Sequence, residues 1–516
     1  MKSKWLNLMP SVPDALFLAV FASLALASGG RLLGDSSTGF HIRAGEVMWD
    51  SGSILKHDVF SFHSPPLPWT AHEWLAEVIM ALIHRPFGLT GIVVFFSLVI
   101  ALTYHLLFRM AAQDRRDVIL GLGIVVLVMV SSQIHWLARP HAFSFVLTTV
   151  WYWILDRYEI AGRNHLLWLP GIMLVWVNLH GGFMFGFVLL GLYFACNIAR
   201  AIFSAGEYRH EAVQKARHLG VATIACVAAS LINPSGYEIL LFPFKLVGDK
   251  FLMDNIMEYA SPNFHQTMPF RYLLYLTIAI LGLSTTRLTL VELALLVLLT
   301  HMALYGVRYI PLFGIIATPI LVRHARVILE QVPGKWSDAF EVLSTKFALP
   351  NDRSRSFWAA GGAVAIIVCA AFAQVSYRFD PEKQPVASVE FLRKANLQGN
   401  MFNNDFLGDY LVYAAWPQYK VFVDGRQDMY GPERLREYDT VTRVAPGWNE
   451  ILAKYRVEWV FSDTNSALSA RISRHPDWEV IYTDGVASIF VRKHSMNDGI
   501  IQRITASSEV ARKPDN

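Results

Sequence analysis

The sequence predicts a polytopic α-helical membrane protein with about eleven spans, followed by a C-terminal extracytoplasmic α/β domain. The chain has 516 residues, of which 54% are hydrophobic and only 17% are charged, which is too apolar for an ordinary soluble core. Apolar runs long enough to cross a bilayer, about 17 to 25 residues, recur until Tyr377 and then stop. We therefore expect a membrane domain at residues 1–376, a soluble domain at 377–495 and a disordered tail at 496–516.

The predicted spans follow from these apolar runs, each of which we interpret as one helix. Their centres lie near Phe21, Leu98, Ile124, Thr149, Met173, Leu189, Thr223, Ile278, Leu296, Ala317 and Ile366. Lys2 and Lys4 precede the first run, whose length favours a retained anchor over a cleaved signal peptide. The stretch from Glu73 to Phe87 contains charged residues and Pro86, which favours a helix lying along the membrane surface.

Basic residues fall on alternate connections between these spans and predict the topology, because short cytoplasmic loops are rich in Lys and Arg. They are Arg115 and Arg116, then Arg157 and Arg163, then Arg200, Arg209, Lys215 and Arg217, then Arg287, and finally Arg323, Arg326, Lys335, Lys346, Arg353 and Arg355. The N-terminus is therefore predicted to be cytoplasmic and the C-terminal domain periplasmic or extracellular. Five further segments are predicted on that outer side: 34–72, 133–141, 178–182, 233–271 and 305–308. We expect a multi-pass protein of the bacterial inner (plasma) membrane, in contact with lipid.

The sequence of the soluble tail predicts a small domain in which helices alternate with short strands. Strand-like apolar runs occur at Lys420–Asp424, Glu458–Phe461, Glu479–Tyr482 and Ala487–Arg492. Helix-like stretches occur at Val386–Lys394 and Asn449–Tyr455. This pattern predicts a compact, sheet-centred domain.

Several function classes lose support from composition and from missing motifs. The formal net charge is +4, and no basic stripe suits a nucleic-acid backbone. Cys196, Cys226 and Cys369 lie inside apolar runs, where neither a disulfide framework nor a thiolate metal site is expected. The sequence also lacks a phosphate-binding Gly-rich Lys loop, a dinucleotide fingerprint and a Gly-x-Ser-x-Gly elbow. Nucleic-acid binding, ATPase, dehydrogenase and serine hydrolase activities are therefore disfavoured.

The first outer loop, residues 34–73, carries the most unusual polar residues. Asp35 follows the first span directly, where a carboxylate is a candidate general base. The same position also suits an aspartate that caps the following helix. Asp58 and Glu73 are further carboxylates of the loop, and two acids that meet over a site take different roles through different pKa values. Asp58 also suits the start of a turn and Glu73 the start of a surface helix.

The predicted outer face carries several histidines, without the spacing of a helical zinc motif. They are His41, His57, His63, His72, His135, His141 and His180. Two of them, His41 and His141, are candidate substrate contacts. No cofactor is predicted, and a divalent-metal site assembled from distant loops is the less favoured alternative.

Other candidate substrate contacts lie at span edges and in the tail. Arg139 offers a fork of donors that suits a phosphate, although a snorkelling arginine would look the same. His180 precedes two glycines that permit close approach of a backbone or a ligand. Asp424 and Arg426 follow the strand-like run of the tail, where α/β sheets present ligand groups; an internal ion pair is the alternative.

Taken together, these segments resemble the membrane glycosyltransferases of the GT-C fold, which use polyprenyl-phosphate sugars. The resemblance rests on Asp35 after the first span, an amphipathic stretch from Ser37 to Asp50, a polar and aromatic turn from Asp58 to Trp69, and a surface helix from Glu73. A narrower set of bacterial GT-C-like proteins shares further motifs, and the match runs from about Asp14 to Arg492. These motifs are Arg139-Pro140, residues 176–182 (Trp-Val-Asn-Leu-His-Gly-Gly), residues 233–237 (Asn-Pro-Ser-Gly-Tyr), residues 261–264 (Ser-Pro-Asn-Phe) and residues 423–426 (Val-Asp-Gly-Arg).

The resemblance implies a catalytic aspartate in the first outer loop, here Asp35, and a polyprenyl-phosphate sugar donor that enters from the bilayer, with the acceptor unspecified. One departure from the family is plain, since many members have a second acidic residue beside the first, whereas Ser36 and Ser37 follow here. This departure argues against a paired-carboxylate or metal-dependent mechanism.

Two other functions stay open at this stage. A non-catalytic scaffold or assembly factor for surface polysaccharide would share the same architecture. A transporter would need ionisable residues within its spans, and Glu292 and His301 are the clearest of these.

Overall fold

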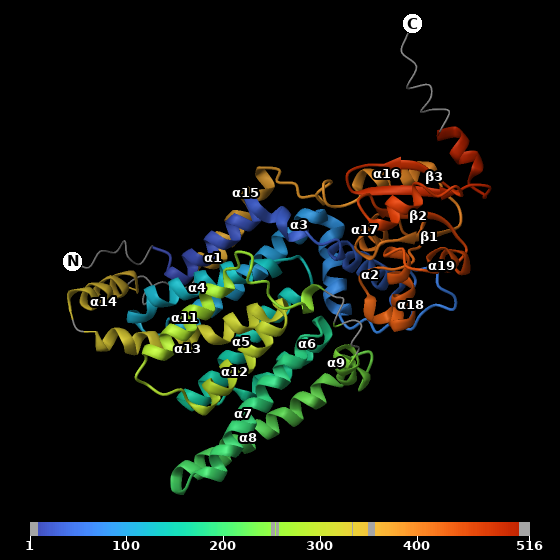
Figure 1. Cartoon of the computed structure of the whole chain (residues 1–516). Coiled ribbons are helices and arrows are strands. Elements are labelled where there is room, and N and C mark those ends of the chain that lie inside the picture. Colours follow the sequence, from blue (N-terminus) through green and yellow to red (C-terminus); the bar gives the residue numbers. More distant parts are fainter. Residues whose placement is uncertain (1–8, 249–252, 254–256, 333, 349–356, 505–516) are drawn as a thin grey trace. The chain divides into compact units, whose positions relative to one another are not determined.

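The computed structural model describes residues 9–248, 253, 257–332, 334–348 and 357–504 of the chain (Figure 1). The chain divides into two compact units. The first unit comprises Met1–Arg31 and Thr90–Ser376, and the second comprises Leu32–Leu89 and Tyr377–Asn516. The first outer loop and the C-terminal tail therefore belong to the same unit, a grouping that hydropathy does not indicate.

The described part of the first unit consists of helices joined by loops and turns. Its helices are α1 (Val12–Ala22), the second part of α3 (Trp74–Ala111), α4 (Val118–Ser132), α5 (His141–Ala161), α6 (Leu169–Leu179), α7 (Phe183–Phe203), α8 (Gly206–Ser230), α9 (Glu238–Gly248), α11 (Phe270–Leu283), α12 (Leu290–Tyr305), α13 (Ile310–Gln331), α14 (Lys335–Ala348) and α15 (Phe357–Phe372). Each predicted span centre lies in one of these helices. Gly88, with φ of 58°, marks the kink in α3 near the point where the chain passes from the second unit to the first.

Five helical segments are long and apolar enough to cross a membrane: Val12–Leu33, Trp74–Ala111, Arg115–His135, Phe183–Phe203 and Val307–Gln331. Four shorter apolar segments accompany them: Leu166–Leu179, Phe270–Leu283, Leu290–Tyr305 and Phe357–Phe372. Apolar helices therefore dominate the first unit as predicted, and the figure of about eleven spans stays a prediction.

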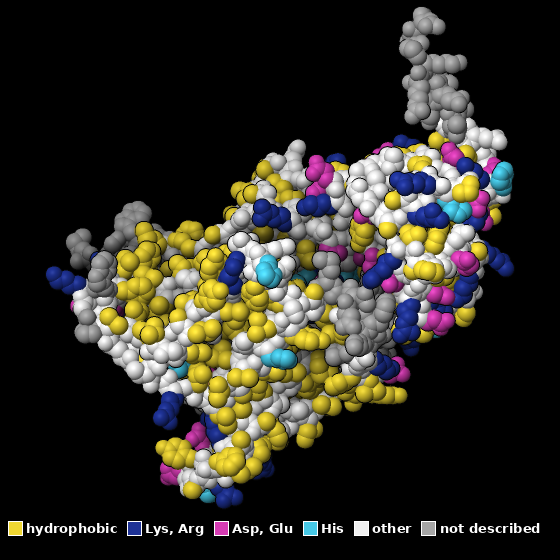
Figure 2. Space-filling model, in the orientation of Figure 1, with side chains coloured by type: hydrophobic (Ala, Val, Ile, Leu, Met, Phe, Trp, Pro, Cys, Tyr) yellow, Lys and Arg dark blue, Asp and Glu magenta, His cyan; other side chains and the backbone are white. Residues whose placement is uncertain are grey.

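The outer surface of these helices is hydrophobic. Figure 2 shows hydrophobic side chains over much of the visible face of the first unit. Phe203 at the end of α7 is 88% exposed and Ile224 in α8 is 72% exposed. Glu207 and Arg209 are exposed at the connection between α7 and α8. Such a surface suits a lipid environment, where apolar side chains need not be buried against protein.

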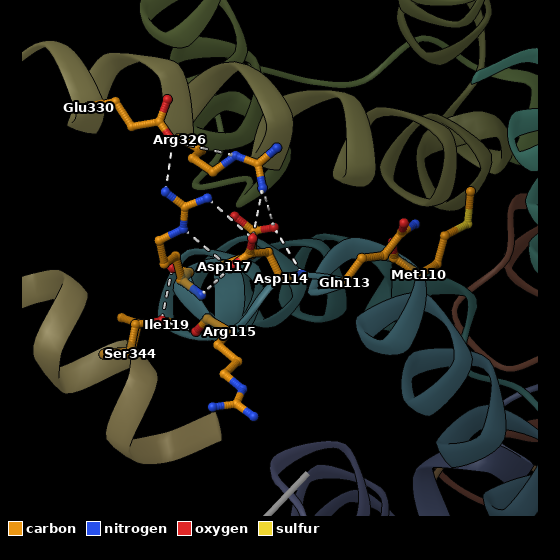
Figure 3. Close-up of polar contacts among 10 residues, drawn as sticks. Met110, Gln113, Asp114, Arg115, Asp117, Ile119, Arg326, Glu330 and Ser344 are labelled. Atoms are coloured by element: carbon orange, nitrogen blue, oxygen red, sulfur yellow. Dashed lines mark hydrogen bonds and ion pairs between the residues drawn. The ribbon is translucent and has the colours of Figure 1, made fainter. Parts of the chain in front are cut away.

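A polar network ties three helices of the first unit together at one end (Figure 3). Arg326 of α13 lies 3.1 Å from Asp117, which immediately precedes α4. Arg116 lies 3.3 Å from Glu330 of α13. The buried Ser344 hydroxyl of α14 contacts the carbonyl oxygens of Arg115 and Arg116 at 2.9 and 2.8 Å. All of these residues lie on connections that the charge pattern assigns to the cytoplasmic side.

The second unit combines helices with a mixed sheet. Its helices are α2 (Ser37–Ser51), the first part of α3, α16 (Val386–Ala395), α17 (Asp405–Ala415), α18 (Gln427–Thr442), α19 (Trp448–Lys454) and α20 (Ala467–Ile472). Its strands are β1 (Asn400–Asn403), β2 (Val457–Asp463), β3 (Trp478–Thr483) and β4 (Ala487–Arg492), in the order β1-β2-β4-β3. β1 and β2 are parallel, and the other two pairs are antiparallel. Residues 498–504 of the expected tail are helical, and 505–516 lie outside the described residues.

The predicted strand at Lys420–Asp424 is wrong. The segment is extended and buried, but it lies outside the sheet and makes one isolated bridge between Val421 and Ser61. Its backbone is satisfied instead by the first loop and by the Asn403 amide, which accepts from Phe422 N at 2.8 Å and donates to the Val423 carbonyl at 2.7 Å. The apolar run therefore reflects burial without sheet pairing.

The strand β1 was not predicted from the sequence. It contains only two apolar residues, Met401 and Phe402, between two asparagines. So short a run carries too little periodicity to mark a strand.

Candidate functional site

Three side chains that could bind a metal meet in the second unit. His41 belongs to α2, Glu73 directly precedes α3, and Glu77 lies in the first turn of α3. His41 Nδ1 is 3.0 Å from Glu77 Oε1 and 3.7 Å from Glu73 Oε2. His41 and Glu77 are buried, and Glu73 is half-buried. We call these three residues the His-Glu cluster.

The local helical geometry explains why the His-Glu cluster forms. Glu73 and Glu77 are four residues apart at the start of α3, so their side chains share one face. His41 and Gly45 are likewise one turn apart in α2. A Cβ atom at Gly45 would lie 1.9 Å from the Glu77 carbonyl oxygen. Only glycine permits this approach of α2 to α3, and the approach places His41 beside the two glutamates.

Two more ionisable groups surround the cluster. His72 Nε2 lies 3.8 Å from Glu73 Oε1. Burial alone would lower the pKa of His72, but the negative charges of Glu73 and Asp428 outweigh it, and the pKa is raised. Burial raises the pKa of Asp428 against the opposing charge of His72. The region is therefore rich in carboxylates and favours a positive charge on His72.

Asp58, Asp424 and Arg426 form a second buried group in the same unit. Arg426 Nη2 lies 2.7 Å from Asp58 Oδ1 and 2.5 Å from Asp424 Oδ2, and Arg426 Nε donates to Asp424 Oδ1 at 2.9 Å. Asp58 also accepts from Phe60 N at 3.0 Å and from Ser61 N at 2.9 Å. This ion-pair network joins the first outer loop to the tail within the second unit.

An aromatic cage completes the surroundings of Arg426. The Arg426 guanidinium carbon lies 5.1, 5.1 and 4.8 Å from the ring centres of Phe40, Phe60 and Trp69. Arg426 is only 5% exposed. Cation–π contacts and two buried carboxylates around an arginine are typical of a structural role. They favour the internal Asp424–Arg426 ion pair that the sequence left open as the alternative to ligand binding.

This network predicts acid sensitivity of the second unit. Burial alone would raise the pKa of Asp58, but the charge of Arg426 and hydrogen bonds from Ser61 and Phe60 outweigh it, and the pKa is lowered. Its stabilising contribution is thus complete above the unfolded pKa of about 3.9 and is lost as pH falls through the folded pKa. We expect the melting temperature of the wild type to drop more steeply between about pH 5 and 3 than that of Asp58→Asn, measured by thermal scans. Equal slopes would contradict this assignment.

Asp35 lies just before α2 in the second unit. Its Oδ1 accepts the backbone N–H of Ser37, the first residue of α2, at 2.8 Å, which is the hydrogen bond of an Asx turn directly before the N-cap residue Ser36. The side chain is half-buried. This hydrogen bond orients the Asp35 carboxylate and does not prevent it from acting as a base. An experiment is therefore needed to distinguish a catalytic Asp35 from one that only stabilises the start of α2.

Arg139, His141 and His180 belong to the first unit. Arg139 Nη1 donates to Glu258 Oε1 at 2.7 Å, and this charge holds the pKa of Glu258 at about 2. Arg308 stacks on Tyr259, next to Glu258, at 4.5 Å. Among the described residues, the positive charges of Arg139 and Arg308 therefore both act on Glu258.

The histidines nearby have protein partners. His141 Nε2 lies 2.8 Å from the His135 carbonyl oxygen, which makes this nitrogen a donor. His180 Nδ1 accepts the backbone N–H of Gly182 at 2.9 Å and lies 2.8 Å from the Ser144 hydroxyl. The His141 and His180 ring centres are 6.5 Å apart, so the structure brings these two predicted residues together.

Glu292, named from the sequence as an intramembrane acid, lies in the first turn of α12. It accepts from Thr289 N at 2.9 Å in a capping box and lies 2.9 Å from Arg323 Nη2. His301 is exposed on the surface of α12. A paired capping glutamate and an exposed histidine give little support to a transport pathway.

Sequence reasoning missed Glu77, His72 and Asp428 as partners in a site. Glu77 lies in the stretch that the sequence predicts as a surface helix, where a single charged residue does not indicate a site. The signal that could have found it is the spacing of Glu73 and Glu77, four residues apart, matched by His41 and Gly45 on the preceding helix.

Comparison with known proteins decides the fold. No protein-family model matches the sequence, and no curated protein matches it. The structure is similar to the crystal structure of an oligosaccharyltransferase from Archaeoglobus fulgidus in the apo form, a GT-C fold enzyme, with a TM-score of 0.55 and 13% sequence identity. The match covers 89% of this chain and 70% of that chain.

The chain has a GT-C-like fold. The resemblance inferred from the first outer loop is thereby confirmed at the level of the fold. The GT-C-like fold and the long apolar helices together indicate a membrane protein. At this level of identity the likeness concerns the fold alone.

Proposed function

We propose that this chain is a membrane glycosyltransferase that moves a sugar from a polyprenyl-phosphate-linked donor to an extracytoplasmic acceptor such as a glycolipid, polysaccharide or protein. The observation that carries the proposal is the GT-C-like fold over 89% of the chain. The proposed location is the bacterial inner membrane, with the N-terminus in the cytoplasm and the C-terminal domain in the periplasm. The basic connections of the first unit support this topology.

In the proposed reaction Asp35 takes the proton from an acceptor hydroxyl, which then attacks the anomeric carbon with inversion. The sugar–phosphate bond breaks, and the polyprenyl phosphate leaves with the bonding electrons. The hydrogen bond from Ser37 N orients the Asp35 carboxylate. Arg139 is the proposed contact for the phosphate of the donor, because the fork of donors on a guanidinium suits a phosphate.

Substitution of Asp35 by asparagine tests the proposal. We expect glycan or glycolipid product to fall by about a hundredfold or more, within the range of general base catalysis, because an amide cannot take the proton. The melting temperature should barely change, since Asn forms an Asx turn as Asp does. Product is measured in cells that hold the variant at the wild-type protein level.

Asp50→Asn is the matched control, because Asp50 lies near the end of α2, the helix that Asp35 precedes, and is largely exposed. It should leave product near the wild-type level. Wild-type product from Asp35→Asn would reject the catalytic role and favour a scaffold for polysaccharide assembly, in which Asp35 only stabilises the start of α2.

A further inference from the structure

We propose that the His-Glu cluster binds a divalent transition-metal ion of the Zn²⁺ class, through His41 Nδ1 and one carboxylate oxygen each of Glu73 and Glu77. The cluster is distinct from Asp35, and its ligands come from α2, from α3 and from the residue directly before α3, all in the second unit. The proposal rests on the geometry of the cluster and is independent of the proposed sugar transfer.

The spacing of the ligand atoms fits such an ion. One ligand atom of each residue lies within 4.8 Å of the others, and His41 Nδ1 is 3.0 and 3.7 Å from the two carboxylates. Metal–ligand bonds to Zn²⁺ are about 2.0 to 2.2 Å long, which places neighbouring ligand atoms about 3 to 3.6 Å apart. Small side-chain rotations therefore suffice to bring all three atoms onto one ion.

Glu77 supplies an independent argument. Its side chain is buried, with 1% of the residue exposed, and its Oε2 atom has no hydrogen-bond partner among the described residues. A buried carboxylate oxygen without a partner costs free energy, and a cation at the cluster removes that cost. Arg426 of the same unit is paired with Asp58 and Asp424.

The donor set selects the class of metal. An imidazole nitrogen with two carboxylates suits Zn²⁺, Mn²⁺ or Fe²⁺, whereas Mg²⁺ and Ca²⁺ prefer oxygen ligands alone. Three protein ligands leave a position open for water or another oxygen ligand, as in catalytic zinc sites. Two carboxylates also balance the charge of a divalent ion.

The test measures metal binding to the purified full-length protein in detergent after removal of metal by a chelator. Co²⁺ is the probe because its absorption reports coordination, and Zn²⁺ is then used to displace it. We expect about one Co²⁺ per chain, displaced by Zn²⁺ and not by Mg²⁺. His41→Ala should weaken Co²⁺ binding by more than about a hundredfold. Loss of a residue that only hydrogen-bonds to a metal ligand weakens binding by at most about a hundredfold, so loss of a ligand itself should exceed that value.

Control variants make the result decisive. His57→Ala removes an exposed histidine of the same loop and should bind as the wild type does. Glu73→Gln alters the half-buried ligand, so it tests the site with less risk to folding, and it should also weaken binding. Zn²⁺ should raise the melting temperature of the wild type and of His57→Ala, but not that of His41→Ala.

Absence of stoichiometric Co²⁺ binding by the wild type would overturn the proposal. So would undiminished binding by folded Glu73→Gln and His41→Ala, or displacement by Mg²⁺ as effective as by Zn²⁺. Metal content is measured without any transfer assay, so loss of the catalytic role of Asp35 would leave this result unaffected, and the reverse holds as well.

Discussion

Arg426→Ala is expected to destabilise the second unit by about 3 to 5 kcal/mol, the usual result of removing one partner from a buried ion pair. The substitution leaves the buried carboxylates of Asp58 and Asp424 without a counter-charge. It also empties the cage formed by Phe40, Phe60 and Trp69. Backbone amides of α17 and of residues 60–62 should then exchange with solvent about a hundredfold faster or more, measured by hydrogen–deuterium exchange.

Two comparison variants identify the cause. Lys394→Ala breaks an exposed pair with Glu390 and should change exchange little, because exposed ion pairs contribute about 0 to 1 kcal/mol. Arg426→Lys keeps the charge but loses the two-pronged contact with Asp424, so it should fall between the wild type and Arg426→Ala. Unchanged protection in Arg426→Ala would show that the buried pair does not hold the unit together.

Gly45→Ala should also have a large effect, about 3 kcal/mol of lost stability, at the upper end of the usual cost of overpacking. The added Cβ would lie 1.9 Å from the Glu77 carbonyl oxygen and 2.9 Å from Val78 N, and both are backbone atoms that cannot rotate away. α2 and α3 must therefore move apart. Melting temperature and Co²⁺ affinity should fall together, because the separation also draws His41 away from Glu77.

Gly485→Ala is the appropriate control, since no atom lies within 4 Å of the added Cβ there. It should leave both melting temperature and Co²⁺ affinity near the wild-type values. A Gly45→Ala protein with wild-type stability would contradict the close approach of the two helices. A stable variant that binds Co²⁺ normally would separate that approach from the metal site.

The burial of Arg426 changes how the tail is understood. The motif at residues 423–426 suggested groups presented to a ligand at the end of a strand. The segment is instead an extended stretch outside the sheet, and its Arg426 is paired with both Asp424 and Asp58. We therefore regard a ligand-binding role for Asp424 and Arg426 as the weaker interpretation, and the exchange experiment on Arg426→Ala addresses their structural role directly.

Local sequence patterns predicted a helix or strand correctly where the hydrophobic periodicity of that one segment was sufficient to identify it. The amphipathic helix expected from Ser37 to Asp50 is α2, Ser37–Ser51, and the strand-like run Ala487–Arg492 is β4 with the same bounds. Hydropathy also located the apolar helices, because a bilayer requires long uninterrupted apolar runs. The strand assigned to Lys420–Asp424 failed because an apolar run reports burial and does not report which backbone pairs with it.

The sequence by itself determined the membrane character of the chain, its helical segments and the carboxylates and histidines of its first outer loop, since these depend on composition and periodicity. Only the tertiary structure decided that the first loop and the tail form one unit, that Asp58 meets Arg426, and that His41 meets Glu73 and Glu77. Those contacts join positions up to several hundred residues apart and depend on packing details such as the missing side chain at Gly45. No local pattern in a single sequence contains that information, because it arises from which surfaces pack together.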